Sequence, residues 1–271
     1  MTQWPTRLIL VGAGKMGGAM TLGWLEGGLA PSSLTILEPN PSEQIVSLAA
    51  SRGFGLNPPK STPPDVLVLA VKPQSLDSAA SKIAPLADMR TLVLSILAGK
   101  TIANLKARLP EVRAIVRAMP NTPAAIGRGV TGAFASPDVT AEQRRWSERL
   151  FGAVGAFHWL DDEAAIDAVT AISGGGPAYV FALTEALAAA AEKLGLPAEL
   201  AMSLARGTVE GSGELMRRES ATSPATLRRN VTSPGGTTAA ALAVLQGEGG
   251  LDSLMERAAV AARARAAGMA G

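Results

Sequence analysis

The sequence predicts an α/β domain with a doubly wound parallel sheet, followed by a smaller all-helical domain. In residues 1–160, short apolar runs of strand length alternate with stretches of helical pattern, as in domains built from βαβ units. A glycine-rich turn joins the first apolar run to the first helix. From Asp161 onward the strand signals stop and Ala-rich helical segments follow. We therefore expect two domains, residues 1–160 and 161–271.

The first domain is expected to contain at least five strands. Their apolar runs are typical of strands buried on both faces of a parallel sheet. They are expected at residues 7–11, 34–37, 66–71, 92–96 and 114–116. Helices are expected from the glycine turn to about Leu25, and at residues 42–50, 74–86 and 102–109. The domain is expected to close near Trp159.

The second domain is expected to contain helices separated by glycine and proline. The helices are expected at residues 163–172, 179–194, 198–216, 238–245 and 251–267. The breakers are Gly195, Pro197, Pro224 and the pair Gly249–Gly250. The longest uncharged run, residues 168–184, is interrupted by three glycines and a proline and ends at Glu185, which argues against a membrane span. We expect a helix buried at a domain or subunit interface instead.

Composition narrows the class of protein. The 271 residues are 47% hydrophobic but only 4% aromatic, so alanine, leucine and valine must fill the core. The formal net charge of +2 and the absence of a basic cluster argue against nucleic-acid binding. Without cysteine there is no disulfide or thiol catalysis, and no secretory signal is expected before the first strand. These features predict a cytoplasmic protein, and no metal-ligand cluster is expected.

The glycine turn, Gly12-Ala13-Gly14-Lys15-Met16-Gly17, has the spacing of a dinucleotide-binding loop between a strand and a helix. In this Rossmann-like arrangement the first glycine permits the turn, the second lets the backbone approach a pyrophosphate, and the third packs helix on strand. The phosphates would lie at the helix N-terminus, which favours anions. A plain glycine turn is the structural alternative.

Glu38 follows the second strand, about 20 residues after the glycine turn, where an acidic side chain can bind the ribose hydroxyls of NAD. A carboxylate there would repel the 2′-phosphate of NADP. Asn40 and Ser42 could instead accept that phosphate, and Glu38 could be only a surface residue beside a proline turn. Two further loops, "AVKPQ" and "RAMPNTPAAIG", should lie at carboxyl ends of strands, where such sheets bind ligands.

Four motifs in this order resemble the pyrroline-5-carboxylate reductase family: "VGAGKMGGAM", the loops "LAVKPQ" and "RAMPNTPAAIGRGVTG", the segment "DAVTAISGGGPAYVF", and "LRRNVTSPGGTTAAALAVLQ". The resemblance spans most of the chain. It implies reduction of 1-pyrroline-5-carboxylate to proline by NADPH or NADH. It also implies a dimer formed through the helical domains, which the family often assembles into a ring of five dimers.

The motifs and the resemblance together define the expected site residues. Those expected to bind the cofactor are Gly12, Gly14, Lys15, Met16, Gly17, Glu38, Pro39, Asn40, Ala70, Val71, Lys72, Pro73, Met119, Asn121 and Pro123. Those that the resemblance implies for the substrate are Ser233, Gly235, Gly236, Thr237 and Thr238. By the same resemblance Thr238 meets the ring nitrogen and is the catalytic candidate. We expect it beside the bound carboxylate, facing the cofactor domain.

The physics of "NVTSPGGTTAAAL" agrees with a carboxylate site. Pro234 and the two glycines keep side chains away from a helix entrance, so the N–H groups of Gly235, Gly236, Thr237 and Thr238 can converge on an anion. An elaborate helix cap is the structural alternative, but one cap residue would suffice. His158 is expected to be structural. A protonated imine is already an electrophile, so the enzyme needs mainly to hold it against the nicotinamide.

The chain departs from the family pattern at three places. Gly175 stands where the family usually has serine, Arg228-Arg229 replaces a Lys-Asp pair, and Glu38 replaces small polar or basic residues found in members that prefer NADPH. Three alternatives stay open: a reductase of another cyclic imine, a hydroxyacid dehydrogenase, and a non-catalytic nucleotide-binding protein. The dehydrogenase should carry a catalytic lysine within residues 163–181, and this segment has none.

Overall fold

The computed structural model describes residues 4–59 and 62–268. The described residues divide into two compact units, one within Met1–Gly175 and Ala262–Gly271, the other Gly176–Ala261. The first unit continues past residue 160, where the sequence predicted a domain boundary. It does so because helix α6 (Ala165–Val169) packs against the sheet of this unit.

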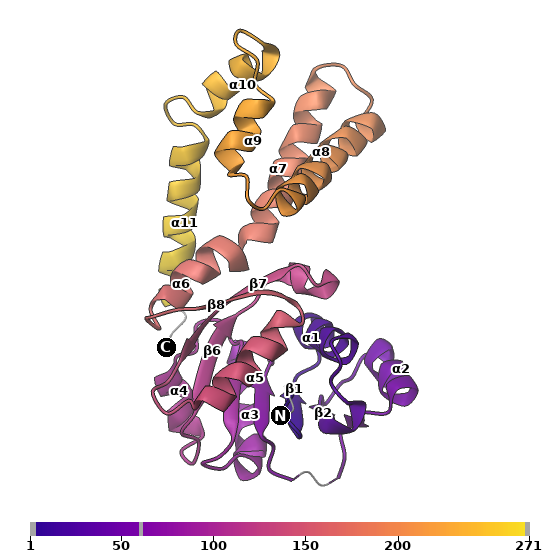
Figure 1. Ribbon diagram of the computed structural model, residues 1–271, viewed down its shortest axis with the longest axis vertical. Helices are drawn as coiled ribbons and strands as arrows, with labels where there is room; N and C mark the ends of the chain where they lie inside the picture. Colours follow the sequence, from indigo (N-terminus) through magenta and orange to yellow (C-terminus); the bar gives the residue numbers. More distant parts are fainter. Residues whose placement is uncertain (1–3, 60–61, 269–271) are drawn as a thin grey trace. The chain divides into compact units, whose positions relative to one another are not determined.

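The first unit is built on one eight-stranded sheet with the order β3-β2-β1-β4-β5-β6-β7-β8 (Figure 1). The strands are β1 (Leu8–Val11), β2 (Leu34–Leu37), β3 (Gly55–Leu56), β4 (Val66–Leu69), β5 (Leu92–Ser95), β6 (Ile115–Met119), β7 (Gly129–Ala135) and β8 (Gly155–Trp159). All neighbouring strands pair in parallel except β6 and β7. The predicted doubly wound, mainly parallel α/β fold is therefore confirmed.

Helices cover both faces of this sheet. Alternate strand residues point to opposite faces, so Leu8 and Leu10 of β1 join one buried cluster, and Ile9 and Val11 join the other. The first cluster receives side chains from α1 (Lys15–Glu26), α2 (Glu43–Arg52) and α5 (Ala141–Gly152). The second receives side chains from α3 (Leu76–Ile83) and α4 (Ile102–Arg108). Burying each large apolar side chain stabilises the fold by roughly 1.5–3 kcal/mol.

The chain order places a switch point beside β1. The chain runs from β1 to β2 and β3 on one side, then returns to β4 on the other side of β1. In open α/β sheets, the carboxyl ends of strands at such a point form the ligand-binding crevice.

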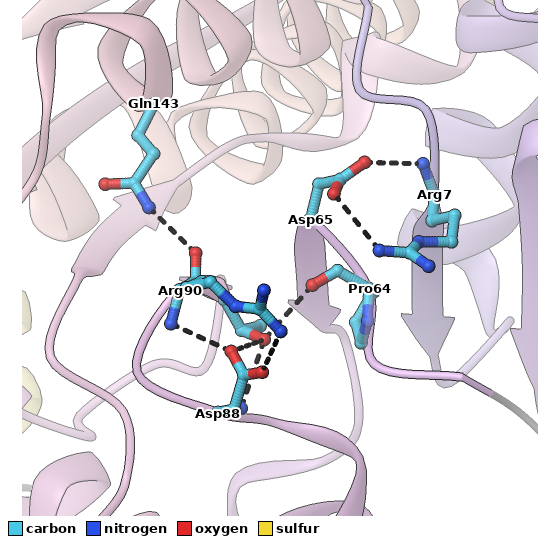
Figure 2. Close-up of polar contacts among 7 residues, drawn as sticks. Arg7, Pro64, Asp65, Asp88, Arg90 and Gln143 are labelled. Carbon is cyan, nitrogen blue, oxygen red and sulfur yellow. Dashed lines mark hydrogen bonds and ion pairs between the residues drawn. The ribbon is translucent and has the colours of Figure 1, made fainter.

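At the amino ends of β1, β4 and β5, opposite to this crevice, polar groups form hydrogen bonds and ion pairs with one another. Figure 2 shows the Asp65 carboxylate accepting from the Arg7 N–H at 2.8 Å, and the Arg90 carbonyl accepting from Gln143 Nε2 at 3.2 Å. The Arg90 guanidinium donates to Asp88 at 2.9 Å and lowers the pKa of that carboxyl. These contacts tie the loops before β1, β4 and β5 to α5. Their role is structural.

Several predicted elements need correction. Strand 66–71 ends at Leu69, which leaves Ala70 and Val71 in the loop, and strand 114–116 runs instead from Ile115 to Met119. Helix 74–86 is α3 flanked by two short 3₁₀ turns, the second of which contains Pro85. The predicted helix at residues 163–172 is shorter: α6 covers only Ala165–Val169, and a π-helical segment, Thr170–Gly174, follows it. The glycine-rich stretch that follows α6 favours such a local distortion over a regular helix.

The second unit is helical, as predicted. Its helices are α7 (Gly176–Lys193), α8 (Ala198–Arg218), α9 (Pro224–Asn230), α10 (Thr237–Leu245) and most of α11 (Leu251–Ala267) (Figure 1). Pro224, predicted to be a breaker, opens α9, because proline fits the first helical position. α7 begins at Gly176 instead of the predicted residue 179 for the same reason, since Pro177 lies in its first turn.

Many apolar side chains of the second unit are exposed. Phe181 is 63% exposed and Leu183 49% exposed on α7, and Leu204 is 51% exposed on α8. Among the described residues, one segment, Ala165–Lys193, is long and apolar enough by length and composition to cross a membrane, and 11% of its most apolar window is buried. An apolar surface of this extent on a water-exposed chain marks an interaction site.

Candidate functional site

A cavity of about 730 Å³ opens at the carboxyl ends of β1, β2 and β4. It lies beside the switch point, and its volume is typical of a small-molecule or cofactor site. It lies wholly within the first unit. Its lining residues are Val11, Gly12, Gly14, Leu37, Glu38, Pro39, Asn40, Asn57, Pro58, Ala70, Val71, Lys72, Ser75, Ser78, Ala79, Lys82 and Ile83.

Glycine is found at the three motif positions for different physical reasons. Gly12 has φ of 95°, and a Cβ there would lie 2.7 Å from the Ala70 carbonyl oxygen, so β1 and β4 leave no room for a side chain. A Cβ on Gly17 would lie 2.2 Å from the Gly12 carbonyl oxygen, which enforces glycine where the helix packs on the strand. A Cβ on Gly14 would meet nothing within 4 Å. Gly14 therefore borders open space, where a ligand can approach the backbone.

The N-terminus of α1 is open to an anion. Its first residue, Lys15, follows Gly14, and no side chain caps the helix. By contrast, Ser42, Thr101 and Thr140 cap α2, α4 and α5 with their hydroxyl oxygens. Because the first-turn N–H groups of α1 lack such a partner, the loop fits a pyrophosphate, and the positive end of the helix dipole adds to that fit.

Glu38 lies beside the glycine loop, directly after β2. One carboxylate oxygen accepts from the Ala13 N–H at 2.9 Å, and the other accepts from the Asn40 N–H at 3.0 Å. Glu38 is half-buried and lines the cavity. The carboxylate is thus fixed against the glycine loop, and its remaining lone pairs can accept from hydroxyl donors.

The cavity brings together eight of the predicted cofactor residues, and these are Gly12, Gly14, Glu38, Pro39, Asn40, Ala70, Val71 and Lys72. The other seven do not line it, and these are Lys15, Met16, Gly17, Pro73, Met119, Asn121 and Pro123. Asn57, Ser75, Ser78 and Lys82 line it and were not predicted. Ser75 could have been found from the loop after β4, whereas Lys82 lies in α3 and a lone Asn57 carries no sequence signal.

Asn121 is buried, at 8% exposed, and both ends of its amide are used within the protein. Its Nδ2 donates to the Ser173 carbonyl at 3.0 Å, and its Oδ1 accepts from the Val130 N–H at 2.8 Å. Asn121 thereby ties the loop after β6 to the π-helical segment and to β7. In this arrangement its side chain fixes the loop.

In the second unit, the predicted substrate residues form the entrance of α10. Gly235 has φ of 68°, and the Gly236 N–H donates to the Ser233 carbonyl at 3.0 Å. Pro234 and Gly235 thus occupy the centre of a turn whose sequence is typical of type II. The prediction that the Gly236 N–H is free was wrong, because that group closes this turn.

The other backbone N–H groups at the N-terminus of α10 have no acceptor within the described residues, as the sequence predicted. Gly236 is the N-terminal cap residue, and no side chain caps the helix. Among the described contacts, the N–H groups of Gly235, Thr237 and Thr238 have no acceptor, and the side chains of Ser233 and Thr238 are exposed. The hydroxyl residues around this entrance therefore do not serve as an elaborate helix cap. That leaves the entrance available to an anion.

No metal site is indicated within the residues that the structure describes, where no group of three or more His, Asp or Glu side chains converges. A second cavity, of about 550 Å³, lies at the amino ends of β1, β4 and β5. It is lined by Arg7, Asp65, Asp88 and Arg90, whose charges are paired with one another, together with Gln143 and neighbouring residues. It has no open glycine-capped helix end.

Comparison with known proteins agrees with this geometry. Residues 163–269 match the family described as pyrroline-5-carboxylate reductase dimerisation. Residues 7–99 match the family described as NADP oxidoreductase, coenzyme F420-dependent. The dimerisation match begins beside the predicted domain boundary and covers the exposed apolar helices.

Two relatives and two solved structures extend the match to the whole chain. Pyrroline-5-carboxylate reductase of Pseudomonas aeruginosa is 40% identical over 97% of both chains, and that of Haemophilus influenzae is 36% identical over 89% of both. The structure of the Coxiella burnetii pyrroline-5-carboxylate reductase covers 98% of this chain and 99% of its own, with a TM-score of 0.89 and 34% identity. The Plasmodium falciparum pyrroline carboxylate reductase with NADP bound covers 98% of both chains, with a TM-score of 0.80 and 29% identity.

Proposed function

Because the chain belongs to the pyrroline-5-carboxylate reductase family, we propose that it reduces 1-pyrroline-5-carboxylate to proline with NADPH or NADH, the last step of proline biosynthesis. One observation carries the proposal beyond the relatives. The two helices that open after the glycine motifs, α1 and α10, have glycine as the cap residue and no side-chain cap. One open helix end suits a pyrophosphate and the other a carboxylate, and the reaction needs both.

The residues at the first helix end fit a dinucleotide. Gly14 leaves open space beside the backbone, no side chain caps the first-turn N–H groups of α1, and Glu38, held beside the glycine loop, would meet the ribose. When bound, the nicotinamide supplies a hydride. The loops after β4 and β6, with Val71, Pro73, Met119, Asn121 and Pro123, would hold the nicotinamide half by resemblance to the family.

The residues at the second helix end would hold the substrate. The N–H groups of Gly235, Thr237 and Thr238 would bind its carboxylate, and Ser233 would add a hydroxyl. Overall, the imine carbon gains a hydride and the ring nitrogen gains a proton. Thr238 would orient the nitrogen: its hydroxyl can accept from a protonated imine and then donate to the amine product. It is proposed to position the nitrogen without being an obligatory proton donor.

We propose the oligomeric state and the cellular compartment on the same basis. The helical domain, from about residue 161, would form a homodimer, and the dimers would assemble into a decamer as the family often does. The apolar segment Ala165–Lys193 would then be covered by protein, not lipid. The absence of cysteine fits a cytoplasmic enzyme, and the weak net charge of +2 argues against a nucleic-acid partner.

The test is an assay of NADPH and NADH oxidation with 1-pyrroline-5-carboxylate, with proline identified as the product. A second substrate, 1-pyrroline, lacks the carboxylate but keeps the imine. If the carboxylate is bound by charge-assisted hydrogen bonds, each worth about 1.5–3 kcal/mol, kcat/KM should fall by roughly 10- to 150-fold or more with 1-pyrroline.

The outcomes separate the alternatives. No oxidation with either imine, together with intact cofactor binding, would indicate a non-catalytic nucleotide-binding protein. Equal efficiency with both imines would remove the carboxylate from recognition and favour a reductase of another cyclic imine. Activity with a hydroxyacid would favour a dehydrogenase, although residues 163–181 lack the lysine that such an enzyme needs.

A further inference from the structure

Asn57 holds the peptide groups on both sides of Glu38. Its Oδ1 accepts from the Glu38 N–H at 2.9 Å, and its Nδ2 donates to the Glu38 carbonyl at 2.8 Å. A side-chain amide has the same donor and acceptor as a peptide. β3 pairs with β2 as far as Leu56 opposite Ile36, and the Asn57 side chain continues this pairing to the residue that carries the carboxylate.

The backbone of Asn57 is also unusual. Its φ of 47° is the one positive value recorded for a non-glycine residue in the described ranges. Asparagine tolerates this left-handed conformation better than most residues, and such conformations concentrate at functional sites. The Asn57 N–H donates to the Ile36 carbonyl at 2.9 Å, which fixes the conformation. Asn57 lines the same cavity as Glu38.

The result is a carboxylate fixed from two sides. Asn57 holds the Glu38 backbone, while the Ala13 and Asn40 N–H groups hold the two carboxylate oxygens. A carboxylate can accept from ribose hydroxyls, but it repels a 2′-phosphate. A carboxylate held in this way cannot turn away from the 2′-phosphate. We therefore expect it to disfavour NADPH more strongly than a mobile carboxylate of the same charge would.

Two groups that could bind a 2′-phosphate on the β2 side are already in use within the protein. The Asn40 N–H donates to the Glu38 carboxylate, and the Ser42 hydroxyl oxygen accepts from the Ile45 N–H at 3.4 Å as the cap of α2, which leaves the Ser42 O–H and the Asn40 side chain as donors beside a fixed carboxylate. Glu43 adds a negative charge in the first turn of α2. The two lysines lining the cavity, Lys72 and Lys82, belong to the wall made by the β4 loop and α3.

We propose that Glu38 and Asn57 make this enzyme select NADH over NADPH, Glu38 by meeting the ribose and Asn57 by positioning Glu38. This deepens the proposed function, because it names which cofactor the cavity takes. It depends on dinucleotide binding and not on the identity of the imine. The test can therefore be made on the protein without substrate.

The experiment measures the Kd of NADH and of NADPH by fluorescence titration, for the full chain and four variants. Glu38→Gln removes the charge. Asn57→Gly removes the amide but allows the same φ. The double variant combines both changes. Glu43→Gln is the matched control, because it removes an exposed carboxylate near the site that does not line the cavity.

The unsubstituted protein should bind NADH roughly tenfold or more tightly than NADPH. Glu38→Gln should remove most of this ratio, Asn57→Gly should reduce it at least about threefold, and Glu43→Gln should leave it unchanged. If Asn57 acts only through Glu38, Asn57→Gly should not alter the ratio further once Glu38 is glutamine. If Asn57→Gly does not fold, Asn57→Ser takes its place in the same cycle.

An unsubstituted protein that prefers NADPH, or an unchanged ratio in Glu38→Gln, would overturn the proposal. Additive effects on the ratio in the double variant would mean that Asn57 acts independently of Glu38, and an unchanged ratio in Asn57→Gly would mean that Asn57 is only structural; either result would overturn its positioning role. Cofactor selection with no reduction of 1-pyrroline-5-carboxylate would leave this inference standing and reject the proposed function. Reduction of the imine with no preference for NADH would support the proposed function and reject this inference.

Discussion

At the scale of single residues, Gly14 and Gly17 belong to one glycine motif, but only Gly17 lacks room for a side chain. Gly17 lacks room, because its Cβ would lie 2.2 Å from a backbone oxygen, whereas Gly14 has open space around it. The first constraint concerns folding, and the second concerns what the loop binds. Substitution by alanine should separate them.

Gly17→Ala should destabilise the protein by roughly 1–3 kcal/mol or prevent folding, because the backbone atoms that it meets cannot move aside. Gly14→Ala should keep the unfolding midpoint. It should weaken NAD(P)H binding roughly 10-fold or more, as expected when one charge-assisted bond to the pyrophosphate is lost. Urea unfolding and fluorescence titration of both variants check this. A strongly destabilised Gly14→Ala protein would contradict this assignment, because it would mean that folding itself requires glycine at position 14.

Thr238 is the residue on which the proposed chemistry depends. Its side chain is exposed at the entrance of α10, with no partner recorded for its hydroxyl. Thr238→Ala should lower kcat/KM by roughly 5- to 150-fold, equivalent to about 1–3 kcal/mol, and Thr238→Ser should recover most of it. Cofactor Kd should hardly change.

Steady-state kinetics of these variants, with Thr208→Ala on α8 as a control, measure the effect. Full activity of Thr238→Ala would remove the residue from the site. Complete loss would instead make Thr238 an indispensable proton donor and contradict a positioning role.

The residue scale also shows what the sequence could reveal about the site. Gly12, Gly14 and Gly17 were predictable, because their roles depend on a local strand–turn–helix pattern. The position of Glu38 beside the glycine turn was predictable from its distance along the chain. Asn57 was not, because its role arises only when β3 pairs with β2 and brings its amide to the Glu38 peptide. The turn closed by the Gly236 N–H was missed, although proline followed by glycine is its ordinary signature.

At the scale of secondary structure, the apolar strands β1, β2, β4 and β5 were predicted within two residues. β7 and β8 were missed. β7 contains Gly129 and Gly132, which weaken the strand signal, and its antiparallel pairing with β6 depends on contacts distant in sequence. Helix 163–172 was overextended for a related reason, since periodicity does not reveal a π-helical segment.

An ion cluster connects three of these elements. Arg117 on β6 is buried and lies 3.2 Å from Glu163 Oε1 and 3.5 Å from Asp167 Oδ1 on α6. Glu163 Oε1 also accepts from the Ile102 N–H at the start of α4. The Arg117 Nε has no hydrogen-bond partner, so part of the cost of burying this cation is not offset. The cluster fixes α6 to the sheet at Arg117, three residues before Pro120, where the loop that contains Asn121 begins.

Arg117→Met should therefore destabilise the protein by roughly 2–4 kcal/mol, because it leaves two carboxylates without their cation. Lys106→Met is the matched control. Lys106 forms an exposed pair with Asp138 at 3.4 Å, and such pairs contribute about 0–1 kcal/mol. Urea unfolding gives both values. Equal effects of the two substitutions would mean that the Arg117 cluster contributes no more than a surface pair.

At the scale of the whole molecule, the two units expose very different surfaces. The first unit encloses two buried clusters around its sheet. In the second, the buried apolar residues are only Ala188, Ala201 and Ala205, while leucines and a phenylalanine are exposed. A unit with so little core gains most of its apolar burial from a partner, and the family match names dimerisation for residues 163–269. The sequence predicted the interface from an uncharged run but could not identify which side chains face the partner.

The protein should accordingly be a dimer or larger at micromolar concentration, and the interface should include Phe181. Phe181→Asp places a charge where the side chain is 63% exposed in the single chain. If a partner covers this position, burial of an unpaired carboxylate should shift the assembly toward monomer and lower the unfolding temperature. Val46→Asp on α2 is the control, because Val46 is 46% exposed and belongs to the first unit. Light scattering over a range of concentrations should show dissociation only for Phe181→Asp. A monomer for the unsubstituted protein would contradict the dimer, and two unaffected variants would place the interface away from Phe181.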